Sequence, residues 1–177
     1  TTRHPPPTHR LLPVAAVAAL ALAVTACGFQ LRGSYRLPDA LFPLQIDAPG
    51  GSAVARELRA TLERQDVELT ADPEAAAARL VILDESSERR ILAIGSSADV
   101  EEYELRTTVR WELVRAAAEG ETTALGPEEL TARRDYGFDP EAVLSKQNEE
   151  DALYEDMSED LAQRLLFRLQ AWSPEPE

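Results

Sequence analysis

Histidine and cysteine, the residues that most often carry catalytic or metal chemistry, are scarce in this chain of 177 residues. Cysteine occurs once, at Cys27, and the two histidines, His4 and His9, both lie within the first 26 residues. Since the remainder has no imidazole, it cannot form a Ser-His-Asp or Cys-His catalytic site or a histidine-ligated metal site. A single cysteine also excludes an internal disulfide.

Positive charge is also scarce. The chain has 18 lysine and arginine residues against 32 acidic ones, a formal net charge of -14, and Lys146 is the single lysine. Arg3 and Arg10 lie in residues 1–26, which contain no acidic residue, so the remainder carries 16 basic and 32 acidic residues, a net of -16. This balance argues against nucleic acid as a partner.

The first 26 residues have the order of a secretory signal peptide. Positive charge in residues 3–10 precedes an apolar run over 11–24, and small residues follow. The run of 14 residues is shorter than the ~20 residues that a membrane-spanning helix requires. We therefore expect residues 1–26 to be a signal segment. Because the sequence begins with Thr1 and not with methionine, the start of the chain is left open.

The end of this segment, Val24-Thr25-Ala26-Cys27, resembles the lipobox of bacterial lipoproteins, in which the cysteine becomes the fatty-acylated first residue. An ordinary signal peptide followed by a chance cysteine is the alternative. Each buried methylene adds about 0.8 kcal/mol, so several acyl chains make attachment effectively permanent. Gly28, where retained lipoproteins have aspartate, resembles the pattern of release to the outer membrane. We expect a lipid anchor at Cys27 on the periplasmic side of that membrane.

The mature chain starts with a short strand and an amphipathic helix. Residues 44–48 alternate apolar and polar between two prolines, which predicts a strand. Ser52 is a plausible N-cap for a helix that extends to residue 65, with apolar residues at every fourth position. A connector over residues 66–79 follows.

The next part of the chain is rich in strands. An apolar run at 80–83 predicts a buried strand, and residues 90–94 continue it or pair with it. Residues 103–113 give the strongest strand signal, because apolar and polar residues alternate throughout. Residues 120–127 have turn chemistry, and residues 130–138 predict another strand that Asp139-Pro140 ends.

A long helix is predicted from Lys146 to Trp172. Its apolar residues recur at steps of three and four, with acidic residues in the first half and arginines near the end. We thus expect an α+β fold with both helices on one face of a mixed or mostly antiparallel sheet, in the order strand, helix, strands, helix. The expected organisation is a linker over 27–38, one domain over 39–172, and a disordered tail over 173–177.

Acidic pairs occur at several places, but the simplest interpretation is a solvated acidic surface. A hydrolase acid and base would require two carboxyl groups at a fixed separation in a cleft. The pairs that we considered are Glu101-Glu102, Glu128-Glu129 and Asp156 with Asp160.

Basic residues are better candidates for a binding site than these acidic pairs, because a chain this acidic needs local positive charge wherever it binds an anion. Arg106 and Arg110 lie on the polar side of the 103–113 strand, and either Arg133 or Arg134 must face the same side. Arginine binds phosphate through two hydrogen bonds. Pairing of these arginines with neighbouring glutamates is the alternative.

Several short segments resemble one known family, in order and spacing, across essentially the whole mature chain. Cys27 to Gly33 with Leu37-Pro38, and Glu102-Tyr103, are the first two. The others are Arg134, Tyr136, Phe138 and Asp139, then residues 143–150, Asp156-Met157 and residues 163–166. Together they resemble the LPS-assembly lipoprotein LptE family.

This resemblance implies a small lipoprotein with two helices on a four-stranded sheet. It would lie as a plug in the lumen of the large outer-membrane barrel LptD, bind lipopolysaccharide and help to place it in the outer leaflet. Of the lipopolysaccharide-contacting positions in the family, the lysine that enters the last helix matches Lys146. The basic residue in the hairpin before the long strand has no counterpart, since residues 93–99 contain none.

Our hypothesis from the sequence is a non-enzymatic outer-membrane lipoprotein, anchored through Cys27, that acts as a barrel plug and handles lipopolysaccharide. Lys146, with Arg106 and Arg110, would bind phosphate, and we expect no cofactor and no metal. The alternative is a periplasmic lipoprotein adaptor that binds protein or peptidoglycan and not lipopolysaccharide. An unfamiliar carboxylate hydrolase ranks last.

Overall fold

The computed structural model describes residues 35–96, 99–117 and 120–173. The chain divides into two units, Thr1–Ser34 and Tyr35–Glu177, and every described residue belongs to the second. The predicted signal segment, the Cys27 anchor and the last four residues of the predicted tail therefore lie outside the described residues.

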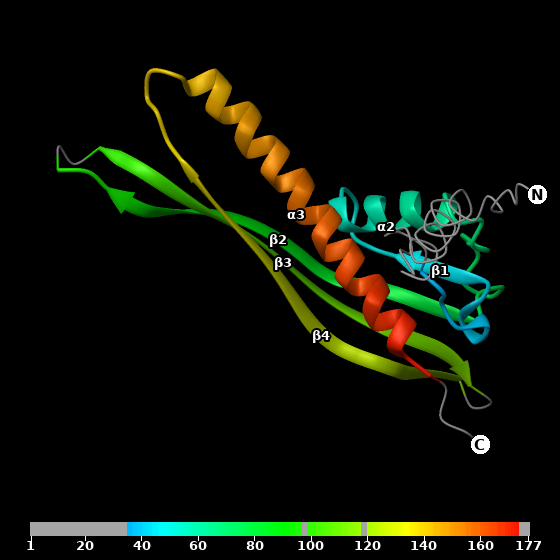
Figure 1. Ribbon diagram of the computed structural model, residues 1–177. Helices are drawn as coiled ribbons and strands as arrows, with labels where there is room; N and C mark the ends of the chain where they lie inside the picture. The colour runs from blue at the N-terminus through cyan, green and yellow to red at the C-terminus, as the bar shows by residue number, and fades with distance from the viewer. Residues whose placement is uncertain (1–34, 97–98, 118–119, 174–177) are drawn as a thin grey trace, which may run out of the picture. The chain divides into compact units, whose positions relative to one another are not determined.

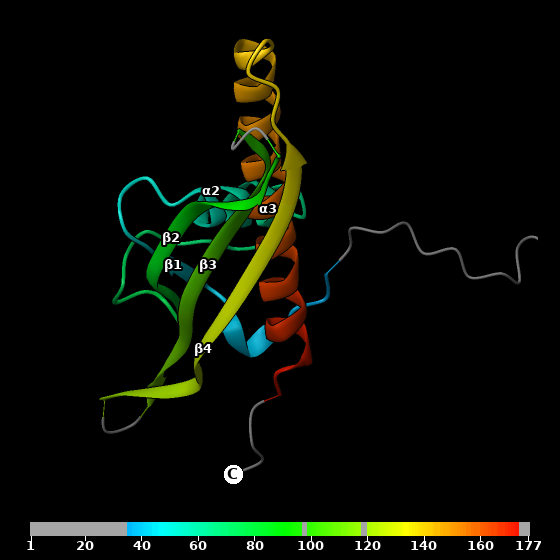
Figure 2. The ribbon, with the colours of Figure 1, turned by 90° about the vertical axis from the view of Figure 1, so that its left-hand side faces the viewer.

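The described elements follow the predicted order and form a single four-stranded sheet. Neighbouring strands in the sheet follow the order β1-β2-β3-β4, with β1 parallel to β2 and the other pairs antiparallel. Both long helices lie on the same face of the sheet (Figures 1 and 2), so the predicted α+β fold is confirmed. We call this face the inner face and the opposite one the outer face. The elements are η1 Asp39–Leu41, β1 Leu44–Asp47, α2 Ala53–Glu63, β2 Ala78–Ile94, β3 Val100–Ala117, β4 Gly120–Gly137 and α3 Val143–Ala171.

Helix α2 begins where the sequence predicts it. The hydroxyl oxygen of Ser52 accepts a hydrogen bond of 3.0 Å from the backbone N–H of Ala55, as an N-cap does. The apolar residues at every fourth position, Val54, Leu58 and Leu62, are fully buried. The spacing of these residues thus fixes which side of α2 faces the sheet.

Strand β2 joins the two predicted segments 80–83 and 90–94 into one strand. A shift in the register between Ile82 and Asp84 places an extra residue, Leu83, in β2 opposite β3. Such a bulge changes which residues face inward, so Glu85, opposite Val109, lies on the same side as Ile82, opposite Trp111.

Strand β3 confirms the predicted alternation. Its inner-face residues from Leu105 to Leu113 are all buried, whereas Arg106, Thr108 and Arg110 point to the outer face. Trp111 lies in the hydrophobic core together with residues from β1, β2, α2 and α3.

The turn predicted at residues 120–127 is wrong, because β4 already begins at Gly120. The glycine that indicated a turn, Gly126, instead forms part of a bulge inside β4. Gly126 has φ +95°, and the register between β3 and β4 shifts on both sides of Leu113. A Cβ atom on Gly126 would lie 2.9 Å from the carbonyl oxygen of Trp111, so this position requires glycine.

Helix α3 starts at Val143, three residues before the predicted start, and its two halves differ. The predicted apolar stripe is buried at Met157, Leu161, Leu165 and Leu169, whereas none of the residues from 143 to 156 is buried. The second half of α3 therefore packs in the core, and the first half depends on other contacts. Among the described helices, α3 included, we find none with the length and apolar character needed to cross a membrane.

Candidate functional site

The first turns of α3 lie over one end of the sheet, which we call the distal end: residues 89–94, 100–105, 134–138 and 143–150 (Figures 1 and 2). Glu150 is the central contact. Its Oε2 atom lies 2.8 Å from Nη1 of Arg89 and accepts a hydrogen bond of 2.6 Å from the Tyr136 hydroxyl. The first half of α3 is thus attached to β2 and β4 by a polar network.

Aromatic rings surround this network. The Arg89 guanidinium lies 4.7 Å from the ring centroid of Tyr103, within the range of a cation–π contact. The Tyr103 ring in turn stacks with Tyr136 at 5.7 Å and meets Phe138 edge to face at 5.4 Å. The hydrogen bond to Glu150 raises the pKa of Arg89, so this side chain keeps its positive charge.

The surroundings of Tyr136 favour its neutral form. Burial, and then its hydrogen bond to Glu150, raise the pKa of Tyr136 to about 12. Burial also raises the pKa of Tyr154, and the charge of Glu150 adds to that effect.

We expect Tyr136 to ionise near pH 12 in the folded protein. Because its folded pKa lies above the ordinary value of 10, the neutral hydroxyl contributes stability that is fully present below pH 10 and is lost as the pH rises toward 12. An ultraviolet titration of tyrosinate would show this late step in the wild type and not in Tyr136→Phe. Identical titration curves for the two proteins would contradict the network.

Lys146 lies one helical turn before Glu150. Its Nζ atom is 2.8 Å from Oε2 of Glu149, and its side chain is 23% exposed. The backbone N–H of Lys146 bonds to the carbonyl of Ala142, so the residue belongs to the first turns of α3. Lys146 is therefore a partly exposed cation with one carboxylate partner at the distal end.

Arg106 and Arg110 lie on the outer face and not beside Lys146. Nη2 of Arg106 is 3.0 Å from Glu104, and its Nε is 3.7 Å from Glu88. Arg106 therefore forms ion pairs with neighbouring glutamates, which is the alternative that the sequence left open. Arg110 is exposed. Since the sheet separates these two arginines from α3, the three predicted phosphate-binding residues do not form a single site.

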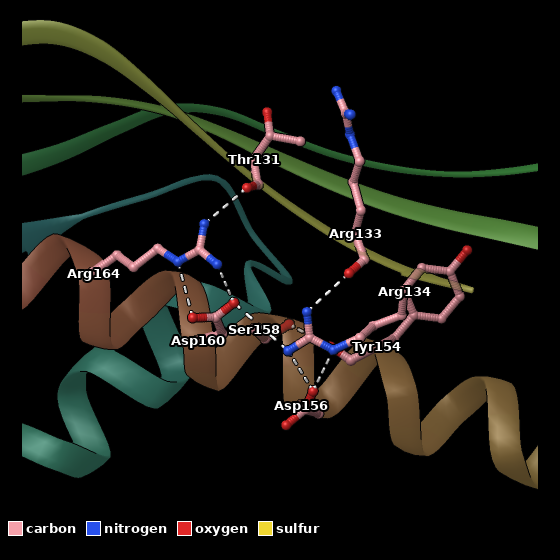
Figure 3. A network of polar contacts seen from close by, with 8 residues as sticks. All are labelled: Thr131, Arg133, Arg134, Tyr154, Asp156, Ser158, Asp160 and Arg164. Atoms are coloured by element: carbon pink, nitrogen blue, oxygen red, sulfur yellow. Dashed lines mark hydrogen bonds and ion pairs between the residues drawn. The ribbon is translucent and has the colours of Figure 1, made fainter. Parts of the chain in front are cut away.

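The register of β3 with β4 separates the roles of the two neighbouring arginines. Arg133 is paired with Arg106 and faces outward. Arg134 is paired with the buried Leu105 and faces α3, where its Nη2 lies 2.7 Å from Asp156 and 3.6 Å from Asp160 (Figure 3). Both carboxylates that the sequence offered as an acid–base pair are thus engaged by guanidinium groups.

Apolar side chains are exposed at the distal end. Leu144, next to Lys146, is 78% exposed, and Val143 beside it is also exposed. On β2, Ile91, Leu92 and Ile94 are exposed as well. The distal end therefore has exposed apolar residues on two elements, with Leu144 near Lys146 on α3 and Ile91 near Arg89 on β2.

Neither of two other hollows contains a predicted site residue. One of about 330 Å³ lies between β1 and α2, and Gln45, Arg59 and Glu63 line it. One of about 170 Å³ lies between α2, β2 and α3. Among the residues that the structure describes, no three His, Cys, Asp or Glu side chains are grouped as metal ligands.

The sequence analysis missed Arg89 and its partner Glu150. Residues 84–89 had no assigned structure, because the apolar signal of β2 stops at Leu83 and returns only at Ile91. Continuing the strand through this gap would have placed Arg89 on the side of Ile91. The contact with Glu150 spans 61 residues, and periodicity gives no signal for such a pair.

These features define a small α+β domain whose described polar groups serve ion pairs and surface contacts. The family model described as "LptE: Lipopolysaccharide-assembly" matches residues 42–169, and the chain belongs to this family. It is 30% identical over 165 residues to the LPS-assembly lipoprotein LptE of Pectobacterium atrosepticum, covering 91% of this chain and 85% of that protein. For the corresponding protein of Photorhabdus laumondii the identity is 28%, with coverages of 91% and 86%.

A solved structure supports the fold. The solution structure of uncharacterized lipoprotein B from Nitrosomonas europaea superposes with a TM-score of 0.67 at 29% identity, covering 81% of this chain and 91% of that one. Since the family match spans β1 to α3, it includes the distal end and both faces of the sheet.

Proposed function

We propose that this protein acts in lipopolysaccharide assembly as a non-enzymatic outer-membrane lipoprotein. It is anchored through Cys27 and occupies the lumen of an LptD-type β-barrel, where it helps to deliver lipopolysaccharide to the outer leaflet. The observation that carries this proposal is the family match over residues 42–169, together with relatives named LPS-assembly lipoprotein LptE.

The outer face supports the plug role. Lumens of outer-membrane barrels are polar, so a protein inside one needs a polar surface around its own core. The outer-face residues of β3, from Glu104 to Glu112, are charged or hydroxylated, and the inner face is buried under α2 and α3. This surface could meet a polar wall without leaving apolar groups in water.

The distal end supports lipopolysaccharide binding. Lipopolysaccharide combines phosphate groups with acyl chains, and the distal end combines Lys146 with the exposed Leu144 and Ile94. We propose that Lys146 binds a phosphate of the lipid. Because Arg106 and Arg110 lie on the outer face, away from α3, we propose the phosphate contact for Lys146 alone.

Replacing Lys146 with glutamate is expected to weaken lipopolysaccharide binding by about 1.5 to 3 kcal/mol, roughly 10- to 150-fold, the range of a charge-assisted hydrogen bond. The same variant should still bring down a stoichiometric β-barrel when the full-length lipoprotein is purified in mild detergent. Both readouts come from one preparation, with lipopolysaccharide affinity measured on the purified protein.

Arg64→Glu is the matched control, because Arg64 is an exposed cation at the end of α2 whose guanidinium donates a hydrogen bond to the Thr61 hydroxyl. Unchanged lipopolysaccharide binding in Lys146→Glu would remove the site and leave the plug role intact. A wild-type protein that brings down no barrel would instead favour the periplasmic adaptor.

A further inference from the structure

The two outermost strands of the sheet, β1 and β4, each have edge groups that already form hydrogen bonds. At β1, the N–H of Leu44 donates to Glu68 and its carbonyl accepts from Thr70, each at 3.0 Å. At β4, the carbonyls of Thr131 and Arg133 accept hydrogen bonds from guanidinium groups of α3 and β4, at 3.1 and 2.9 Å (Figure 3). Addition of a partner strand requires such groups to be free, so these stretches of β1 and β4 are poor sites for it.

The outer face is a layer of charged and hydroxylated side chains on three strands. Neither α2 nor α3 covers it (Figure 2). Over its central part it has six carboxylates and four guanidinium groups, so it is slightly acidic and of mixed sign. The carboxylates belong to Asp84, Glu88, Glu104, Glu112, Glu129 and Asp135, and the guanidinium groups to Arg90, Arg106, Arg110 and Arg133.

Two directly paired positions on this face carry like charges, Glu104 with Asp135 and Arg106 with Arg133, and the arginine pair is the positively charged one. Arg106 and Arg133 are direct register partners on β3 and β4, an arrangement that destabilises a sheet when both residues carry the same charge. Arg106 is compensated by Glu104 and Glu88. The Arg133 side chain is exposed, points away from the α3 network in Figure 3, and has no ion pair within the described part of the chain.

Neighbouring groups add hydrogen-bonding capacity to this pair. The hydroxyls of Thr108 and Thr131, two positions along each strand, lie 3.2 Å apart. The pair therefore offers two guanidinium groups beside two hydroxyls, the chemistry that binds one oxyanion.

We propose that the outer face docks against a protein wall that places a carboxylate side chain between Arg106 and Arg133. This inference rests on the proposed plug function and names the chemistry of that contact. A single carboxylate compensates Arg133, whereas a surface dense in phosphate would be repelled by the six carboxylates around the pair. The rest of the face, with both signs of charge, fits a polar wall that also carries both signs.

The test is Arg133→Glu in the full-length lipoprotein, purified in mild detergent with its barrel. We expect the amount of barrel recovered to fall about tenfold or more, because glutamate meets the partner carboxylate with the same charge. Lipopolysaccharide binding should stay at the wild-type value, since Arg133 lies on the face opposite Lys146. Arg90→Glu is the control on the same face, because Arg90 is 3.5 Å from Glu88 and is already compensated.

The outcomes separate this inference from the proposed function. Full recovery of the barrel with Arg133→Glu, under conditions where the wild type recovers it, overturns the docking contact alone. Loss of lipopolysaccharide binding with the barrel retained also overturns it, and identifies a phosphate as the occupant. A wild type without a barrel overturns the proposed function and this inference together. Circular dichroism of each variant verifies that the fold is retained.

Discussion

Replacing Trp111 with alanine is expected to lower the free energy of unfolding by about 3 to 5 kcal/mol. Trp111 is the largest of the fully buried side chains and lies in the middle of β3, opposite Ile82 of β2. Its removal would leave a cavity between the sheet and the helices that the surrounding leucines cannot fill. Chemical denaturation followed by far-ultraviolet circular dichroism measures the loss.

Trp111→Phe is the matched control. The indole N–H of Trp111 is buried and has no hydrogen-bond partner, so phenylalanine keeps most of the packing and removes an unsatisfied donor. We expect this variant to lose less than half as much stability as the alanine variant. If alanine cost under about 1 kcal/mol, the site would have collapsed around the smaller residue, and Trp111 would not organise the core.

The same strand illustrates why much of the fold is predictable from sequence. On a sheet with one buried face, the alternation of apolar and polar residues around Trp111 determines which side chains face the core. A shift of one residue would bury Arg110 and expose Trp111. The stripe at Met157, Leu161 and Leu165 determines α3 in the same way. Elements with a strong periodic pattern were therefore predicted with the correct type and face.

The predictions from sequence were wrong or incomplete where the same residues occur in more than one kind of local structure. Glycine and proline at 126–127 indicate a turn, but in β4 they form a bulge against β3, and only the neighbouring strand distinguishes the two. The polar residues of β2 likewise hide a strand, because its inner-face side chains there have polar partners: Glu85 contacts the start of α2, and Arg89 contacts Glu150 of α3.

The candidate site was less predictable than the fold. Lys146 was found through the family resemblance, whereas Arg89 enters only because the fold brings it to Glu150. The choice between Arg133 and Arg134 depended on a register that the sequence left open by one residue, and that residue decides which arginine meets α3 and which faces outward. Periodicity predicts faces, but not partners across long sequence separations.

The two halves of α3 are held in place by different contacts. The second half is buried in the core, and the first half is attached through Glu150 and leaves Leu144 exposed. Exposed apolar groups contribute nothing to the core, so the first half of α3 is held by its polar contacts and not by burial.

Replacing Glu85 with alanine is expected to destabilise the protein by about 2 to 4 kcal/mol, because three donors of α2 lose their acceptor. The Glu85 carboxylate, on the inner face of β2, accepts from the Ser52 hydroxyl at 2.5 Å and from the N–H groups of Ala53 and Val54 at 3.1 and 3.4 Å. A strand thereby supplies charge to the positive end of a helix, a contact that the predicted Ser52 cap did not reveal. Denaturant unfolding measures the loss.

Two further variants separate charge from hydrogen bonding at this helix end. Glu85→Gln keeps an acceptor without the charge and should cost about half as much as Glu85→Ala, since bonds to charged groups are about twice as strong. Ser52→Ala should cost about 1 kcal/mol, the ordinary value for an N-cap. Combined with Glu85→Ala, it should add less than its full cost, because Ser52 and Glu85 share one hydrogen bond. If the losses of stability in Ser52→Ala and Glu85→Ala were fully additive, the two residues would not act together at the start of α2. A Glu85→Gln variant as unstable as Glu85→Ala would show that glutamine does not replace the carboxylate as an acceptor.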